Sequence, residues 1–174
     1  KADRWLQAAK ILEDGGDRDG AIERYKKALD AQPTNVVATT ALRAAYLARG
    51  DATSAVELIS KTIDITDGTL AKARLYGEMA QILRDKLKDN DRAEKAATKA
   101  VDLDPTSING LLISGDLAFE NERFLEAAKS YASIANRVDV LPKEEQPKLL
   151  MRYVDSLSKS GSAEKAAGVV EKLL

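Results

Sequence analysis

The sequence predicts an all-α protein, a solenoid of about five helix-turn-helix pairs with about ten antiparallel helices. Three observations lead to this expectation. The composition favours helices, because 44% of the 174 residues are hydrophobic but only 5% are aromatic, and alanine and leucine carry much of the apolar content. Apolar residues recur three and four positions apart, which is the spacing of one helix face. Related stretches also return along the chain at a nearly constant interval, as in a repeat protein.

Five stretches of the chain resemble one another. They begin at Gly16, Gly50, Lys88, Glu122 and Gly161, with separations of 34, 38, 34 and 39 residues. The sixth residue of each stretch is an alanine, and mostly apolar residues follow it four and seven positions later. These alanines are Ala21, Ala55, Ala93, Ala127 and Ala166. Because this spacing lies on one helical face, each stretch is predicted to be the second helix of a pair, with its alanine in close contact with the first.

Another amphipathic run precedes each repeated stretch and is predicted to be the first helix of the pair. Its apolar stripe includes Trp5, Ala9 and Leu12 in the first unit, Leu42 and Tyr46 in the second, Leu111, Gly115 and Ala118 in the fourth, and Tyr153 and Leu157 in the fifth. The second helices of units one and three are expected to end at Pro33 and Pro105, because proline cannot continue a helix.

The third unit needs a different register. Counting back from Pro105 would place Gln81 and Arg84 in the core, which is costly for polar side chains. A shift by one residue replaces them with apolar positions and requires one extra residue in the turn at 87–90. The shifted core positions are Tyr76, Met79, Ala80 and Leu83. The junctions at 67–72 and 139–147 are also long, and we interpret them as a longer first helix or a connector, with a local change in superhelix pitch as the alternative.

These residues resemble a tetratricopeptide repeat (TPR) array along nearly the whole chain. The family pattern has Trp, Leu, Gly and Tyr on the first helix and Ala, Phe, Ala and Pro on the second. The matches are Trp5, Ala21, Tyr25, Ala28 and Pro33 in unit one, and Gly115, Ala118, Ala127 and Tyr131 in unit four. The resemblance implies a right-handed α-solenoid and a single array over 1–174, with units at about 2–35, 36–69, 70–107, 108–141 and 142–174. Another α-solenoid built of similar helix pairs is the alternative.

Some positions depart from that pattern. Unit two has Thr39 where the family has an aromatic residue and Arg43 where a small residue is usual, and the final proline is replaced by Asp67 and Asp139 in units two and four.

Composition excludes several classes of function. The net charge is −1, so there is no basic field for nucleic acid, and no apolar run is long enough to insert into a membrane. Without cysteine or histidine, the chain has no disulfide, thiolate or histidine base. The stretch from Gly15 resembles a calcium loop but has Lys26 where the bidentate glutamate is required, and Ser156 and Lys159 lack the partner motifs of a serine acylase. We therefore expect no enzyme activity, cofactor or metal, and a soluble protein of the cytoplasm or the periplasm.

A ligand is expected on the first helices, which line the inner face of a TPR superhelix. The groove candidates are Lys10, Ala41, Ala44, Arg74, Glu78, Gln81, Asn109, Ile113, Asp116, Lys148, Arg152 and Asp155. Some TPR proteins grip a C-terminal carboxylate with lysine, asparagine and arginine. Only Lys148 and Arg152 match that arrangement, so an extended peptide or a partner helix fits this mixed groove better.

The sequence thus predicts a protein-protein interaction scaffold that binds a peptide or a partner segment in its concave groove. The alternative is a structural self-association module, and the third hypothesis is an enzyme or sensor built on the solenoid. On the last helix, Ala166, Val170 and Leu173 are expected to face the preceding helix, which would leave Val169 and Leu174 uncovered. We therefore expect an excerpt of a longer chain, with self-association through uncapped ends.

Overall fold

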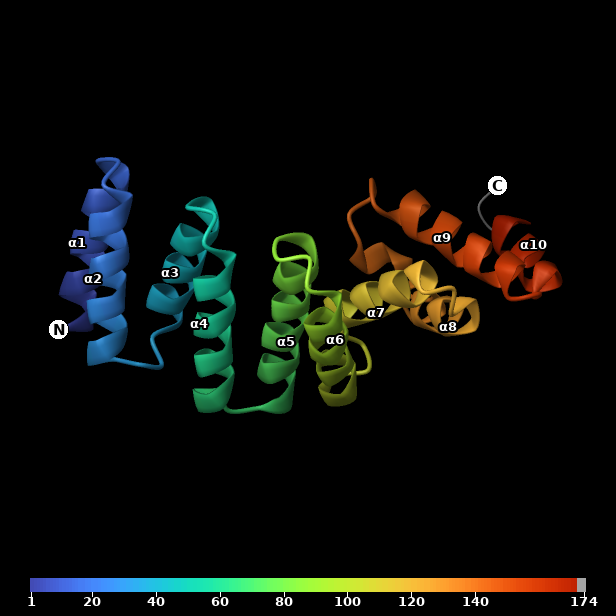
Figure 1. The fold of residues 1–174 in the computed structure, drawn as a ribbon, viewed down its shortest axis with the longest axis horizontal. Coiled ribbons are helices and arrows are strands. Elements are labelled where there is room, and N and C mark those ends of the chain that lie inside the picture. The colour runs from blue at the N-terminus through green and yellow to red at the C-terminus, as the bar shows by residue number, and fades with distance from the viewer. Residues whose placement is uncertain (172–174) are drawn as a thin grey trace.

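The computed structural model describes residues 1–171 of the chain (Figure 1). It contains ten α-helices and one short 3-10 helix, and no strand occurs in this range. The α-helices are α1 (Ala2–Asp14), α2 (Arg18–Ala31), α3 (Val36–Ala48), α4 (Ala52–Ile65), α5 (Thr69–Asp85), α6 (Asn90–Leu103), α7 (Ile108–Glu120), α8 (Phe124–Ala135), α9 (Gln146–Lys159) and α10 (Ala163–Glu171). The 3-10 helix η1 spans Val138–Val140. The predicted all-α solenoid is confirmed.

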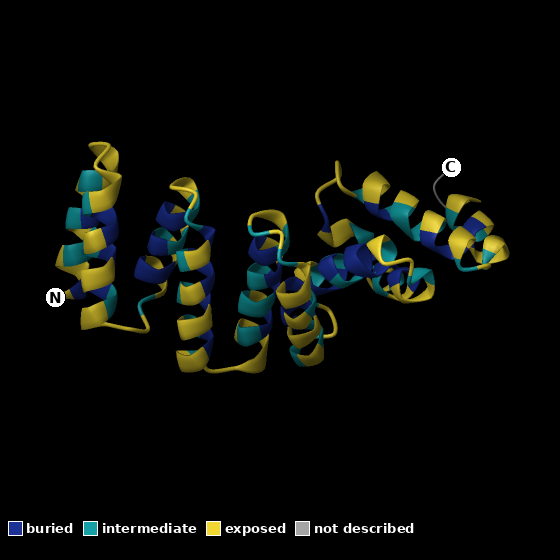
Figure 2. Cartoon of the chain, in the orientation of Figure 1, coloured by how far each residue is buried: buried dark blue, intermediate teal, exposed yellow. Residues whose placement is uncertain are grey.

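Helices that follow one another along the chain pack side by side, and α5 also packs against α7. The helices α1–α6 stand upright in Figure 1, whereas α7–α10 are turned across them. Buried residues face the neighbouring helices and exposed residues cover the outside of each pair (Figure 2). The apolar interior is a series of clusters, from α1–α4 through α4–α7 to α8–α10. A solenoid is expected to have such a core, because each unit contacts only its neighbours.

The aligned alanines lie where the repeat places them. Ala21, Ala55, Ala93, Ala127 and Ala166 are all buried. The two tyrosines four positions after Ala21 and Ala127 are buried as well, and Gly115 on α7 gives Tyr131 its room. A Cβ added at Gly115 would lie 2.7 Å from Cε1 of Tyr131. Small residues at these positions therefore allow the two helices of a pair to approach closely.

We expect Ala127→Leu and Ala21→Leu each to lower the free energy of unfolding by about 1 to 3 kcal/mol, because neither site has space for a larger side chain. Urea denaturation followed by circular dichroism measures the loss. The same change at Ala44, an exposed residue of α3, is the matched control and is expected to have little effect. An unchanged midpoint for both buried sites would contradict the close contact.

The turn inside each pair has one residue with a positive φ, and that residue is the first of each repeated stretch. Gly16, Gly50 and Gly161 have φ near +80°, while Lys88 and Glu122 have φ of 56° and 60°. In the first three pairs an aspartate follows and caps the second helix: the side chains of Asp17, Asp51 and Asp89 accept a hydrogen bond from the backbone three residues on. The third turn has three residues between α5 and Asp89 where the others have two, as predicted.

Glu122→Gly is expected to raise the free energy of unfolding by about 1 kcal/mol, because the left-handed conformation strains any residue that carries a Cβ. Thermal unfolding measures the change. Gly50→Ala is the opposite control: a Cβ there meets nothing within 4 Å, so any loss reports the backbone conformation alone. A stabilising Gly50→Ala or a destabilising Glu122→Gly would contradict this account.

The shifted register of the third unit is correct for part of α5. Ala80 and Leu83 are buried, and Tyr76 and Met79 are half-buried against the same cluster. Ala73 and Gly77 are also buried, which the prediction missed. The reason is that α5 contacts α7 as well as α6: a Cβ at Gly77 would lie 3.1 Å from Cβ of Asn109. Of the two long junctions, the first lengthens α5 and the second forms a connector that contains η1.

The prediction for the last helix is partly wrong. Val169 packs against the cluster of α8–α10, whereas Val170 is 41% exposed. The buried stripe of α10 thus continues from Ala166 by three residues instead of four. The predictions for Leu173 and Leu174 lie outside the described residues. None of the described helices has the length and apolar character needed to cross a membrane.

Candidate functional site

A cavity of about 250 Å³ lies between three first helices, α5, α7 and α9. Six of the predicted groove residues line it: Gln81, Asn109, Ile113, Asp116, Lys148 and Arg152. Arg84, Asp85, Leu112, Leu141, Glu145 and Leu149 complete the lining. The structure therefore brings together half of the candidates, from three successive helix pairs.

The floor of this cavity is apolar and its rim is polar. Ile113, Leu141 and Leu149 are buried in the clusters on either side of α7. Gln81, Asn109 and Lys148 are exposed. An apolar floor surrounded by a few amide and charged groups is typical of ligand-binding sites, where the polar groups fix the orientation of the ligand.

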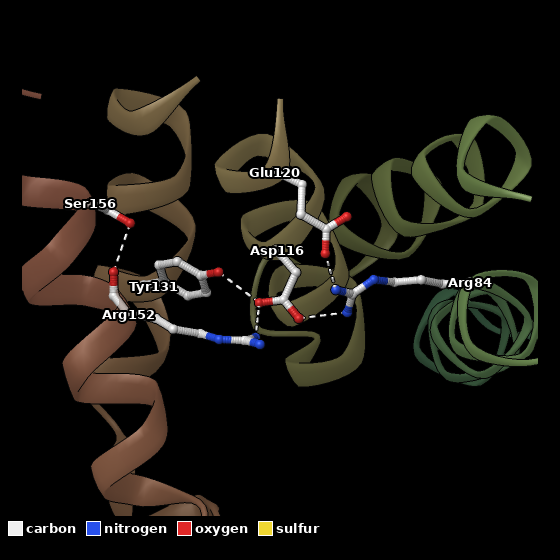
Figure 3. A network of polar contacts seen from close by, with 6 residues as sticks. All are labelled: Arg84, Asp116, Glu120, Tyr131, Arg152 and Ser156. Atoms are coloured by element: carbon white, nitrogen blue, oxygen red, sulfur yellow. Dashed lines mark hydrogen bonds and ion pairs between the residues drawn. The ribbon is translucent and has the colours of Figure 1, made fainter. Parts of the chain in front are cut away.

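A buried carboxylate ties the walls of the cavity together (Figure 3). The side chain of Asp116 on α7 is 8% exposed and accepts three hydrogen bonds. Nη1 of Arg84 on α5 lies 2.5 Å from its Oδ2, and the hydroxyl of Tyr131 on α8 donates to its Oδ1 at 2.6 Å. Nη1 of Arg152 on α9 donates to the same Oδ1. Asp116 thus holds one arginine from each neighbouring unit.

The burial of Asp116 is possible because these donors replace the water that a carboxylate loses. Arg84 also donates from Nη2 to Oε1 of Glu120 at 2.6 Å, so its guanidinium bridges two acids of α7. Burial and the neighbouring Asp116 both raise the pKa of Tyr131, which keeps the phenol protonated as a donor. Ser156 is fully buried and donates to the backbone oxygen of Arg152 at 2.7 Å, which is a structural role.

A second cavity of about 470 Å³ lies between α3, the end of α4 and the start of α5. Two further candidates, Arg74 and Glu78, line it together with Arg43, whose Nε lies 2.8 Å from Oε1 of Glu78. Burial raises the pKa of Glu78, and the attraction of Arg43 lowers it only in part. The remaining candidates, Lys10, Ala41, Ala44 and Asp155, line neither cavity.

The raised pKa of Glu78 predicts a pH effect on stability. A carboxyl group whose pKa is higher in the folded state favours folding when it is protonated, and this contribution is lost as pH rises through the folded pKa. Glu78→Gln is therefore expected to raise the unfolding midpoint at pH 7, with the difference disappearing below about pH 4, where the unfolded carboxyl is also protonated. Thermal scans of both proteins between these pH values test it, and Glu57→Gln on exposed α4 surface is the control. A difference that grows as pH falls would contradict the assignment.

The prediction from sequence missed Arg84, and the rejected register contained it. Counting back from Pro105 placed this arginine inward. The structure also has it inward, because it pairs with Asp116, which lies 32 residues later in the chain. Leu141 and Glu145 were missed because they belong to the connector before α9. Within residues 1–171 there is no group of three or more acidic residues arranged to hold a metal ion.

The ten helices of the described chain, packed in consecutive pairs, define an α-solenoid of helix-turn-helix units. Tetratricopeptide repeat profiles match residues 12–75 and 73–107, which together exceed half of the chain. The chain belongs to the tetratricopeptide repeat family, whose members are scaffolds for protein-protein interaction and typically not enzymes.

Similar proteins agree with this family. The protein CTR9 homolog of Arabidopsis thaliana is 23% identical over 138 residues, which are 79% of this chain but only 12% of that protein's length. Among solved structures, MamA is 20% identical with a TM-score of 0.72 and covers 98% of this chain and 88% of its own. PilF of Pseudomonas aeruginosa is 15% identical with a TM-score of 0.72, over 99% and 75%. YrrB, described as a TPR protein with an unusual peptide-binding site, is 16% identical with a TM-score of 0.67, over 99% and 84%. The TM-scores of the three solved structures show a shared fold.

Proposed function

We propose that this chain binds an extended peptide or partner segment along its first helices, anchored in the cavity between α5, α7 and α9. The observation that carries this proposal is the convergence of six predicted groove residues on one cavity. The apolar floor would accept an aliphatic or aromatic side chain, and the exposed amides of Gln81 and Asn109 would bond the peptide backbone. The peptide-binding site described for YrrB, a similar fold, is consistent with this mode.

The Asp116 network would give the site its rigidity. Arg84 and Arg152 are held by Asp116, so binding would not have to order them, and pre-ordered groups bind with less loss of entropy. Lys148, one helical turn before Arg152, has no ion-pair partner in the described part of the chain and would supply the free positive charge of the site. A partner segment with an acidic residue next to its apolar anchor would therefore be favoured.

Selection of peptides from a displayed random library against the purified chain tests this function. The selected peptides are expected to bind at least about tenfold more weakly to Lys148→Glu and to Asn109→Ala, because both side chains are exposed at the rim and form no side-chain hydrogen bond or ion pair within the described residues. Lys61→Glu on α4 and Lys129→Glu on α8, both exposed on second helices, are the matched controls.

Three results would count against this site. Equal losses of affinity in the rim variants and the controls would mean that the peptide does not bind on the first helices. A loss of affinity in the controls alone would mean that the peptide binds on the second helices. Sedimentation that shows concentration-dependent oligomers, together with a library that yields no binder, would support the alternative of a self-association module.

A further inference from the structure

The departures from the family pattern in unit two lie together in space. Thr39 stands where the pattern has an aromatic residue, and Arg43 follows one turn later where it has a small residue. Both line the cavity of about 470 Å³ between α3, α4 and α5. Thr39 is buried but small, and it bonds only the backbone of its own helix, through the oxygen of Asn35. The small side chain of Thr39, where the pattern has an aromatic ring, therefore leaves space between these units.

The guanidinium groups of this cavity have hydrogen-bond donors without an acceptor. The side chain of Arg43 is 15% exposed, and Glu78 is its only ion-pair partner in residues 1–171. One carboxylate cannot accept from all five N–H donors of a guanidinium. Arg74 on α5 lines the same cavity and has no ion-pair partner in the described chain. The lining thus holds two arginines and two acidic residues, Glu78 and the exposed Asp67, and of these acids only Glu78 forms an ion pair with an arginine in the described chain.

Exposed aliphatic residues gather at the mouth of the same cavity. Val36 is 75% exposed and Ile65 is 45% exposed, and both belong to its lining. Their neighbours Val37 and Leu70 are exposed as well. Leu75 contributes a half-buried wall deeper inside. Large aliphatic side chains that stay in water at one place, beside a cavity, indicate a surface that a partner covers.

We propose that this cavity is a second binding site, which takes an extended segment of a partner protein through one branched aliphatic side chain and the carboxylate next to it. The aliphatic side chain enters between Val36, Ile65 and Leu75. The carboxylate lies between Arg43 and Arg74, where planar guanidinium groups bind carboxylates through paired hydrogen bonds. Such a carboxylate would accept hydrogen bonds from the guanidinium donors that Glu78 leaves without an acceptor.

This site goes beyond the function proposed above and does not depend on it. Its lining shares no residue with the cavity between α5, α7 and α9. A partner that reached both sites would gain affinity through linkage, because the second contact would then form at a high local concentration.

A short peptide with blocked ends is a direct probe of the full chain. The probe is acetyl-Gly-Ser-Asp-Leu-Ser-Gly-amide, and its matched partners carry Asn for Asp or Ser for Leu. Blocked ends leave the aspartate as the sole carboxylate. Titration of the ¹⁵N-labelled chain by NMR is expected to shift backbone amides of α3 and the first half of α5, with affinity about tenfold lower for either altered peptide.

Two variants make the assignment specific. Arg43→Gln removes the charge but keeps a polar side chain, and it is expected to weaken the aspartate peptide about tenfold but not the asparagine peptide. Thr39→Trp restores an aromatic residue to the cavity and is expected to abolish binding while raising the thermal midpoint. Lys148→Glu in the other cavity, on α9, is expected to leave this peptide unaffected, which separates failure of this site from failure of the first.

Several outcomes would overturn the proposal. Equal affinity for the Asp and Asn peptides would mean that the arginines do not bind the carboxylate. Amide shifts confined to other helices, or no shift at millimolar peptide, would show that the peptide does not bind in this cavity. Shifts at α3 and α5 that grow with protein concentration alone would assign the cavity to a second copy of the chain.

Discussion

Asp116→Ala is expected to lower the free energy of unfolding of the α7–α9 region by about 3 kcal/mol, the lower end of the range for removing one partner of a buried ion pair. The variant leaves the buried hydroxyl of Tyr131 without its acceptor. It also leaves Arg152 without an ion-pair partner, because Asp116 is its only one in residues 1–171. The loss stays at the lower end for two reasons. Glu120 still accepts from Arg84, and the side chain of Arg152 is 37% exposed and can turn to water.

The position of the loss is as informative as its size. Because each unit of a solenoid contacts only its neighbours, the effect is expected to be local. Amide hydrogen exchange should show faster exchange in α7, α8 and α9, with α1–α4 unchanged. Glu120→Ala is the matched control: it removes a carboxylate that is 50% exposed from the same arginine, and exposed pairs contribute only about 0 to 1 kcal/mol.

A uniform loss of protection over the whole chain would contradict this description, since it would mean that the chain unfolds as one unit. Equal losses for Asp116→Ala and Glu120→Ala would contradict it too, because burial would then have no influence on the strength of the ion pairs.

The sequence was sufficient for those parts of the fold that depend on local pattern. The alanines of the second helices are buried because a small residue recurs at one position of a repeating face, and that periodicity is visible without tertiary information. The first residue of each repeated stretch has a positive φ, because the same turn recurs at the same place in every pair. Even the longer turn near Lys88 could be predicted, since an alternative register would have buried polar side chains.

The sites depend on pairs that are far apart in the chain, and there the prediction was incomplete. Arg84 was excluded from the interior because an isolated arginine is costly to bury. Its partner Asp116 was placed on the inner face as a ligand-binding residue, but its oxygens are occupied by Arg84, Tyr131 and Arg152. Neither residue alone reveals the pair, because each is unfavourable inside without the other.

The unusual residues of unit two were visible in the sequence, but their consequence was not. Thr39 and Arg43 are departures from the family pattern that the sequence alone reveals. The structure shows that they line one cavity with Arg74 and Glu78, which belong to the next unit. In unit two the departures from the repeat pattern therefore lie at the interface with the next unit.

Tyr131→Ala is expected to cost about 3 to 5 kcal/mol, the range for truncation of a buried aromatic side chain. Tyr131 is fully buried, packs against Gly115 and donates to Asp116, so truncation removes core volume and a hydrogen bond to a charged group. Tyr131→Phe keeps the ring and isolates the hydrogen bond, for which we expect about 2 kcal/mol because the acceptor is ionised.

Tyr25 provides the matched comparison, since it holds the same position in the first pair. Its hydroxyl donates to Oε2 of Glu13 at 2.9 Å, and Glu13 is an exposed residue. Water can replace that acceptor, so Tyr25→Phe is expected to cost less than Tyr131→Phe. Urea denaturation gives the free energies, and hydrogen exchange should place the Tyr25 effect in α1 and α2 and the Tyr131 effect in α7–α9. If Tyr25→Phe were as costly as Tyr131→Phe, the buried carboxylate of Asp116 would not be what makes the fourth pair rigid, and the support proposed for the neighbouring cavity would be lost.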